Sequence, residues 1–356
     1  MENLFVELLQ IAIGKRRCLS VIPTKEEWLF LYETAKQQSL LGVLFYGIQK
    51  DGAEKPERKL LLKWYSVSEK IKQGNQKTNR AAVELAQFFR RNGFRTCILK
   101  GQGNSLGYPD PYIRTNGDID IWVEGNPKRV LNFVLKGCPQ SEFIYHHIEF
   151  KRINGIETEV HYRPSFMNNL IHNKRMQRWF ESVADEQFGN EVELPDGAGK
   201  VCVPTNGFNR IYQMSHISNH FFHEGIGLRQ IVDYYFVLRQ GFTEEERLHD
   251  EKLLKELGLY KMASAVMFVL KEVLALEPEL MLVPANEKLG RFLLDEILQA
   301  GNFGQYDRRV KHEQNGWTKN MQRLKRDMRL MCYFPSECLW EPVFRWYHFF
   351  WRLRNR

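Results

Sequence analysis

The stretch "GDIDIWV" constrains the fold more than any other part of the chain, because it sets two carboxylates one residue apart inside an apolar run. Successive side chains of a β-strand point to opposite faces, so Asp118 and Asp120 would share one face. Ile119, Ile121 and Val123 would share the other face and pack inward. Two neighbouring carboxylates repel each other and lose hydration when they are enclosed. The stretch therefore predicts a strand whose polar face meets a positive counter-charge.

A divalent cation would provide that counter-charge. Mg²⁺ takes oxygen ligands and is commonly held by one or two carboxylates together with substrate phosphates. A third carboxylate is available in "GIETEVHYRP", where Glu157, Glu159 and His161 alternate on one strand face. If that strand lies beside the first, Glu159 is the expected third ligand and Glu157 is the fallback nearer the turn. The alternative is an edge strand whose acids are simply solvated.

The surrounding pattern predicts a small α/β module between two helical regions. The turn signal Asn154-Gly155 joins the last two of four expected strands, which cover residues 95–100, 118–123, 142–153 and 156–163. Hydrophobic periodicity predicts helices over residues 2–14, 25–39, 57–92, 127–135, 244–257, 259–275 and 286–300. A pair of short strands is expected over residues 191–204, with Asp196-Gly197 as its turn.

The expected fold class is therefore α+β, a small mixed sheet with flanking helices embedded between helical regions. We expect an N-terminal helical region (1–77), a core (78–165), a connecting segment (166–206) and a C-terminal helical domain with a basic tail (207–356). The N-terminus lacks the basic-then-apolar order of a signal peptide, and no apolar run reaches the length of about 18 residues that spans a membrane. A cytoplasmic protein without a membrane partner is expected.

Two of these motifs resemble a known family. "LKG…YPDPYIRTNGDIDIWV", followed by "ETEVHYRP", looks like the uncharacterised nucleotidyltransferase family that is widespread in bacteria and belongs to the DNA polymerase beta-like superfamily. The resemblance is specific over residues 97–163 and extends more weakly to residues 216–238. It implies a minimal nucleotidyltransferase fold, bound Mg²⁺ or Mn²⁺, and an NTP donor. It does not identify the acceptor, for which a small molecule, a protein or RNA are all open.

Residues just before the two aspartates would bind the triphosphate. Gly101 would let the backbone approach a phosphate closely, and the N–H groups of a following short helix would donate to it. Gly101-Gln102 stands where the superfamily usually has Gly-Ser or Gly-Gly, with Ser105 four residues after the glycine. Lys100 and Arg114 are the available cations. The alternatives are a strand-end role for Lys100 and a salt bridge from Arg114 to one of the two aspartates.

A helical segment further along carries three histidines on one face. His216, His220 and His223 follow the spacing i, i+4, i+7, which resembles a zinc site but lacks the Glu of the HExxH motif. The alternative is a polar helix face directed at the cleft between modules. Arg229 could contribute to nucleotide binding, and its spacing from Asp233 would also allow an ion pair.

The strand histidines have less direct expected roles. Glu159 is the best candidate to accept the proton of the acceptor. His161 is expected to pack on the strand or to support a metal ligand rather than to act as a base. His146 and His147 are neighbours in an expected strand, so only one of them should face the cleft.

The last part of the chain is basic and aromatic. Residues 306–356 contain twelve Lys or Arg against five Asp or Glu, together with Trp317, Trp340, Trp346 and Trp351. Such a tail could bind nucleic acid through phosphate charge and base stacking, or it could be a helical face that packs on the rest of the chain. The expected function is a metal-dependent nucleotidyltransferase. The alternative is a catalytically silent nucleotide-binding or protein-interaction module on the same fold.

Overall fold

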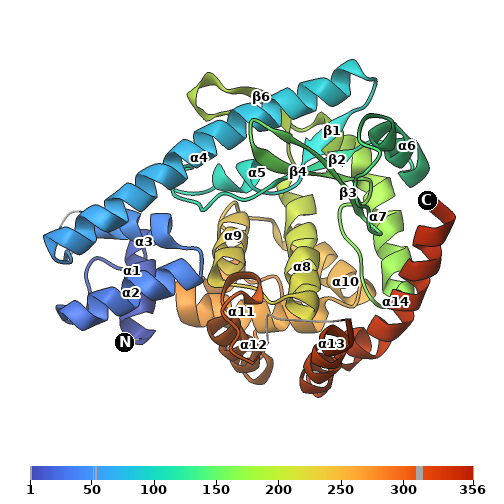
Figure 1. The fold of residues 1–356 in the computed structure, drawn as a ribbon. Coiled ribbons are helices and arrows are strands. Elements are labelled where there is room, and N and C mark those ends of the chain that lie inside the picture. Colours follow the sequence, from blue (N-terminus) through green and yellow to red (C-terminus); the bar gives the residue numbers. More distant parts are fainter. Residues whose placement is uncertain (1, 51, 53, 310–315, 356) are drawn as a thin grey trace.

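The computed structural model describes residues 2–50, 52, 54–309 and 316–355, and these form an α+β fold (Figure 1). Helices α1 (Glu2–Ala12), α2 (Lys25–Gln37) and α3 (Leu41–Ile48) make up the N-terminal region. Thr24 caps α2, and its side chain and that of Glu27 form the reciprocal capping box that the sequence predicts. Along the chain, the strands of the small sheet follow this region and precede the C-terminal helices, and α1 packs directly against α11 (Tyr260–Leu274).

The central sheet has four strands in the order β1-β2-β4-β3. They are β1 (Thr96–Ile98), β2 (Ile119–Val123), β3 (His147–Ile153) and β4 (Ile156–His161). β2 pairs parallel to β4, and the β1–β2 and β3–β4 pairs are antiparallel. The sheet is therefore mixed, as expected. Its register places Asp120 directly beside Glu159.

The two faces of β2 meet different parts of the molecule. Ile119, Ile121 and Val123 are buried in a core shared with α4 (Arg58–Arg91) and α6 (Pro127–Gly137), which confirms the inward face predicted from the alternation. Helix α4 ends at Arg91 with Asn92 as its cap, and the next residue, Gly93, takes a positive φ of 78°, the usual backbone after a helix end. The other face carries Asp120 and then Trp122, which stacks on the ring of Phe208.

The region after the sheet is almost entirely helical. Helix α7 (Leu170–Gly189) leads into the predicted strand pair, β5 (Glu191–Leu194) and β6 (Gly199–Cys202). The following helices are α8 (Asn206–His223), α9 (Leu228–Leu238), α10 (Glu244–Glu256), α11 (Tyr260–Leu274), α12 (Glu287–Ala300), α13 (Gly316–Met331) and α14 (Pro335–Asn355). Among the described residues, no helix combines the length and apolarity needed to cross a bilayer. The largest core takes in residues from Leu4 to Cys338, and the predicted region boundaries stay a prediction.

One predicted strand is wrong in its first half. Residues 142–146 fold back on the start of β3 instead of extending it, because the N–H of Ile144 donates to the carbonyl of His147 at 2.9 Å and Phe143 bridges to Ile148. β3 therefore begins only at His147. β4 ends at His161, two residues earlier than predicted, because the next two backbone N–H groups both donate to the carbonyl of His146.

Candidate active site

The structure brings the three predicted carboxylates together at the two central strands of the sheet, β2 and β4. Asp120 on β2 and Glu159 on β4 are register partners in the parallel pair, and Asp118 immediately precedes β2. Asp120 is only 3% exposed, whereas Glu159 is half-buried and Asp118 is exposed. Asp118 and Glu159 line a common cavity. The three carboxylates thus form one cluster, in which Asp120 is buried and Asp118 is accessible to solvent.

Two cations compensate the buried carboxylate. The Nζ of Lys100 lies 2.8 Å from Oδ1 of Asp120, and the Nε2 of His161 lies 2.9 Å from the same oxygen. The same imidazole nitrogen is 3.4 Å from Oε2 of Glu159. Burial alone would raise the pKa of Asp120, but Lys100 and His161 outweigh it and hold this pKa well below its usual range. Asp120 is therefore ionised in the folded protein.

The other groups of the cluster shift with it. The charge of Asp120 raises the pKa of Asp118 to about 6. Burial alone would lower the pKa of His161, but its hydrogen bonds to Asp120 and Glu159 raise it to about 9. Burial would also lower the pKa of Lys100, yet the three carboxylates raise it. The carboxylates thus keep Lys100 and His161 in their charged forms. Asp118 is the carboxylate whose ionised form is disfavoured, because the negative charge of Asp120 repels it.

The turn after β1 has the predicted short helix. Gly101 takes a φ of 58° and precedes α5 (Gln102–Ser105), and the space beside its Cα is open. The backbone N–H of Leu99 donates to the carbonyl of Asp120 at 2.9 Å, which ties this turn to the carboxylate strand. The hydroxyl of Ser105 is buried and donates to the carbonyl of Gln102 at 2.8 Å. Phosphate binding by Gly101 and Ser105 stays a prediction, and neither residue lines the cavity.

Arg114 forms a salt bridge, as its alternative role required, but its partner is neither Asp118 nor Asp120. Its guanidinium makes two hydrogen bonds to the carboxylate of Asp233 on α9, at 2.7 and 2.8 Å, and Tyr108 donates to the same carboxylate. The spacing of Arg229 and Asp233 would allow an ion pair, but Arg229 donates to the carbonyl of Thr115 at 3.1 Å. Both arginines are buried outside the cavity lining, so their place in the structure is to anchor the loop that leads into Asp118.

A cavity of about 520 Å³ opens in front of the carboxylates. The α8 wall comprises His216, Asn219, His220, Phe222 and His223, which agrees with the alternative of a mainly polar helix face toward a cleft. A zinc site on α8 gains no support. Among the described residues, the groups of side chains close enough together to share a metal ion do not include the α8 histidines. The far wall comes from α13 and α14, through Arg323, Arg326, Asp327, Glu341, Phe344, Arg345 and His348.

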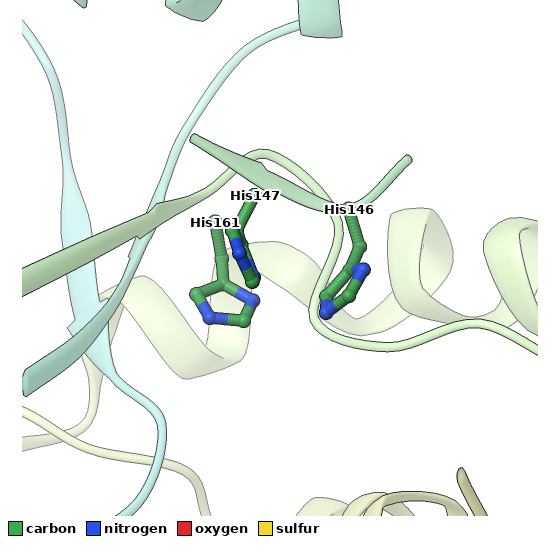
Figure 2. Close-up of side chains that lie close together, drawn as sticks. All are labelled: His146, His147 and His161. Atoms are coloured by element: carbon green, nitrogen blue, oxygen red, sulfur yellow. The ribbon is translucent and has the colours of Figure 1, made fainter. Parts of the chain in front are cut away.

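His146 and His147 both line this cavity, so the expectation that only one would face it is wrong. The reason is the reversal before β3, since strand alternation does not apply to His146. Figure 2 shows the rings of His146, His147 and His161 projecting to the same side of the hairpin. Burial lowers the pKa of His147 to about 4 and holds that of His146 well below its usual range, so both rings are neutral.

The family of the chain follows from a sequence comparison. Residues 24–275, more than two thirds of the chain, match the family model described as uncharacterised nucleotidyltransferase. The chain belongs to this family. No curated protein matches it in sequence. The crystal structure of an antigenic nucleotidyltransferase-like protein from Paracoccidioides brasiliensis matches 61% of this chain and 97% of that chain, with a TM-score of 0.36 and 15% identity.

The family match ends before the far wall of the cavity begins. Helices α13 and α14 lie after residue 275, yet they supply seven of the residues that line the cavity of this family member. Sequence reasoning assigned the tail to nucleic acid or to packing and missed this contribution. The available signal was the mixture of arginines, acids and aromatic residues in the tail, but the sequence does not show which helix face turns inward.

Proposed function

We propose that this protein is a metal-dependent nucleotidyltransferase that transfers a nucleoside monophosphate from an NTP to an acceptor. Membership of the family supports the general reaction class. The observation that carries the proposal is the convergence of Asp118, Asp120 and Glu159 from two parallel strands, with Lys100 beside them, at the edge of a cavity. The cavity volume of about 520 Å³ falls within the usual range for small-molecule sites, about 300–1,000 Å³.

The residues present fit a divalent cation. Three carboxylates offer only oxygen atoms, the ligands that Mg²⁺ and Mn²⁺ accept. The cluster has three carboxylates but only two cations in contact with it among the described residues, Lys100 and His161, so part of the negative charge is left for a bound cation. Asp118, Asp120 and Glu159 would hold the cation, which when bound would neutralise charge that develops on the transferred phosphoryl group.

The chain's own groups would have distinct roles. Lys100 carries its charge at the cavity edge, where it can pair with the triphosphate as well as with Asp120. Glu159 is half-buried at the cavity and can accept the proton of an acceptor hydroxyl or amine. The walls of α8, α13 and α14 would limit the access of water to the reacting phosphate. The acceptor, whether a small molecule, a protein or RNA, would enter between these walls.

One observation favours a second candidate function. Lys100 and His161 already bond the same oxygen of Asp120, so a cation must compete with them for that oxygen. A nucleotide-binding module without turnover would retain this arrangement. Calorimetry distinguishes the two candidates, because the silent module would bind NTP and never release pyrophosphate.

The test is label transfer from NTP into acceptors of a cell extract. With Mg²⁺ and an α-labelled NTP, we expect transfer by the wild-type protein and a loss of at least 100-fold in Asp118→Ala/Asp120→Ala, since each carboxylate is a ligand. The matched control is Glu157→Ala, because Glu157 lies two residues before Glu159 but is exposed and pairs with Arg152. Transfer that persists in the double variant would contradict the proposal.

A further inference from the structure

Three imidazoles lie together beside the carboxylate cluster, and nucleotidyl transfer as proposed above does not use two of them. The ring centroids are 4.5 Å apart for His146 and His147, 5.2 Å for His147 and His161, and 5.4 Å for His146 and His161. One nitrogen of each ring lies within 4.8 Å of a nitrogen of each of the other two. The three side chains project to the same side of the hairpin (Figure 2).

The backbone fixes the positions of all three. His147 and His161 are register partners on β3 and β4, so they are direct neighbours on one sheet face. The carbonyl of His146 accepts hydrogen bonds from the N–H groups of Tyr162 and Arg163, at 3.1 and 3.2 Å, which pins His146 against the end of β4. The cluster is therefore built by strand pairing and by the reversal before β3.

Two of the imidazoles have a ring nitrogen without a hydrogen bond. The Nδ1 of His146 is buried and makes no hydrogen bond to any described residue. The Nδ1 of His147 is also buried and lies 3.1 Å from Oε2 of Glu159 without the geometry of a hydrogen bond, which adds a carboxylate oxygen to the three nitrogens. Buried polar atoms without partners are uncommon in folded proteins and call for a ligand, a water or an ion.

We propose that His146, His147 and His161 form a second metal site, which takes a first-row transition-metal dication of the Zn²⁺ or Fe²⁺ type. Imidazole ligands suit these ions, whereas Mg²⁺ requires oxygen ligands. In a tetrahedral site, two nitrogens bound to one Zn²⁺ lie about 3.4 Å apart, because each bond is about 2.0–2.1 Å. The three nitrogens, which now lie within 4.8 Å of one another, would therefore move closer together on binding, and His161 would release its proton, because only a neutral imidazole is a ligand. Glu159, water or a substrate atom in the cavity would complete the coordination.

This site adjoins the proposed Mg²⁺ site, because His161 contacts Asp120 and Glu159, but its test needs no nucleotidyl transfer. It is tested with the chelator-treated full-length protein, without nucleotide, by calorimetry with Zn²⁺ and by the visible absorption of added Co²⁺. We expect one equivalent to bind the wild type, with affinity reduced at least tenfold in His146→Ala and in His147→Ala. His147→Gln, which keeps a polar side chain, should show the same loss, and circular dichroism of each variant confirms folding.

Two further variants locate the ion. His220→Ala/His223→Ala removes histidines from the α8 wall of the same cavity, and Asp118→Ala removes an acid of the proposed Mg²⁺ site. Both should bind Zn²⁺ as the wild type does. The inference is overturned if the wild type binds no Zn²⁺, if the His146 and His147 variants retain full affinity, or if either of the two locating variants abolishes binding. None of these outcomes depends on NTP turnover.

Discussion

At the scale of single residues, Asp120 is the centre of the site. It is buried, ionised and bonded by two cations, and its strand neighbour across the parallel pair is a third acid. The two-residue period of a strand predicted that Asp118 and Asp120 lie on the same face. The same alternation in a second strand predicted Glu159 as the third carboxylate. The partner of Arg114 was not predictable in this way, because Asp233 lies on a helix 119 positions along the chain.

Lys100 supplies a prediction at this scale. Replacing it by Met removes one of the two cations on Asp120, so the protein should unfold at a lower temperature without metal. The stabilisation by added Mg²⁺ should be larger in Lys100→Met than in the wild type, because the ion no longer competes with the ammonium group. Differential scanning fluorimetry across a Mg²⁺ series measures both effects.

Lys200→Met is the control, since Lys200 is exposed and lies on β6. An equal or smaller Mg²⁺ shift in Lys100→Met than in the wild type would show that the cation does not bind at Asp120.

At the scale of elements, the loop of residues 106–117 is held against α9. The Arg114–Asp233 pair is buried on both sides, with side-chain exposures of 7% and 5%, and Asn75 of α4 donates to the carbonyl of Arg114 at 2.8 Å. The loop fixes where β2 begins and therefore where Asp118 stands. Hydrophobic periodicity and capping residues predicted β2, α2 and the end of α4. They did not predict the structure of residues 142–146, where backbone-to-backbone hydrogen bonds reverse the chain direction.

Breaking this anchor should be costly. Asp233→Asn leaves a buried guanidinium without its counter-ion, so we expect a loss of about 3–5 kcal/mol in the free energy of unfolding, measured by urea titration. Glu287→Gln, which breaks an exposed pair with Arg291, should cost less than about 1 kcal/mol. A similar cost for both would contradict the anchoring role.

The pH dependence of this anchor has a defined sign. Burial alone would raise the pKa of Asp233, but Arg114 lowers it below its usual value. The stabilisation is present above the pKa of the unfolded carboxyl and is lost as the pH falls through the lower folded value. The stability difference between the wild type and Asp233→Asn should therefore shrink on acidification.

At the scale of the whole molecule, the C-terminal helices α13 and α14 have an inner face that packs on the protein and an outer face that is exposed. Their inner face closes the cavity, and Trp351 packs on Tyr162 and Phe143 of the sheet module. Their outer face leaves Trp346 and Phe350 more than 60% exposed. Residues 310–315 and the side chain of Trp317 fall outside the described residues. Composition predicted a packed face or a nucleic-acid surface, and it does not specify which side chains lie on which face.

Nucleic-acid binding by this outer face stays a proposal, and Arg352 and Arg354 are exposed beside the two aromatic residues. Single-stranded RNA should bind at low salt and weaken steeply as salt rises. Trp346→Ala/Phe350→Ala should lower the affinity at least tenfold in a filter-binding assay. Leu62→Ala/Tyr65→Ala, on the exposed side of α4, is the matched control and should have no effect. Absence of an RNA complex at low salt would exclude this surface as the acceptor site.

The central claim is that Asp118, Asp120 and Glu159 hold a cation that engages an NTP in the cavity. The most direct measurement is the anomalous diffraction of Mn²⁺ in crystals soaked with a non-hydrolysable NTP. The account predicts an Mn²⁺ peak bounded by these three carboxylates, with the triphosphate between it and Lys100. A nucleotide bound in the cavity with no Mn²⁺ at the carboxylates, or Mn²⁺ and nucleotide both bound elsewhere, would contradict it.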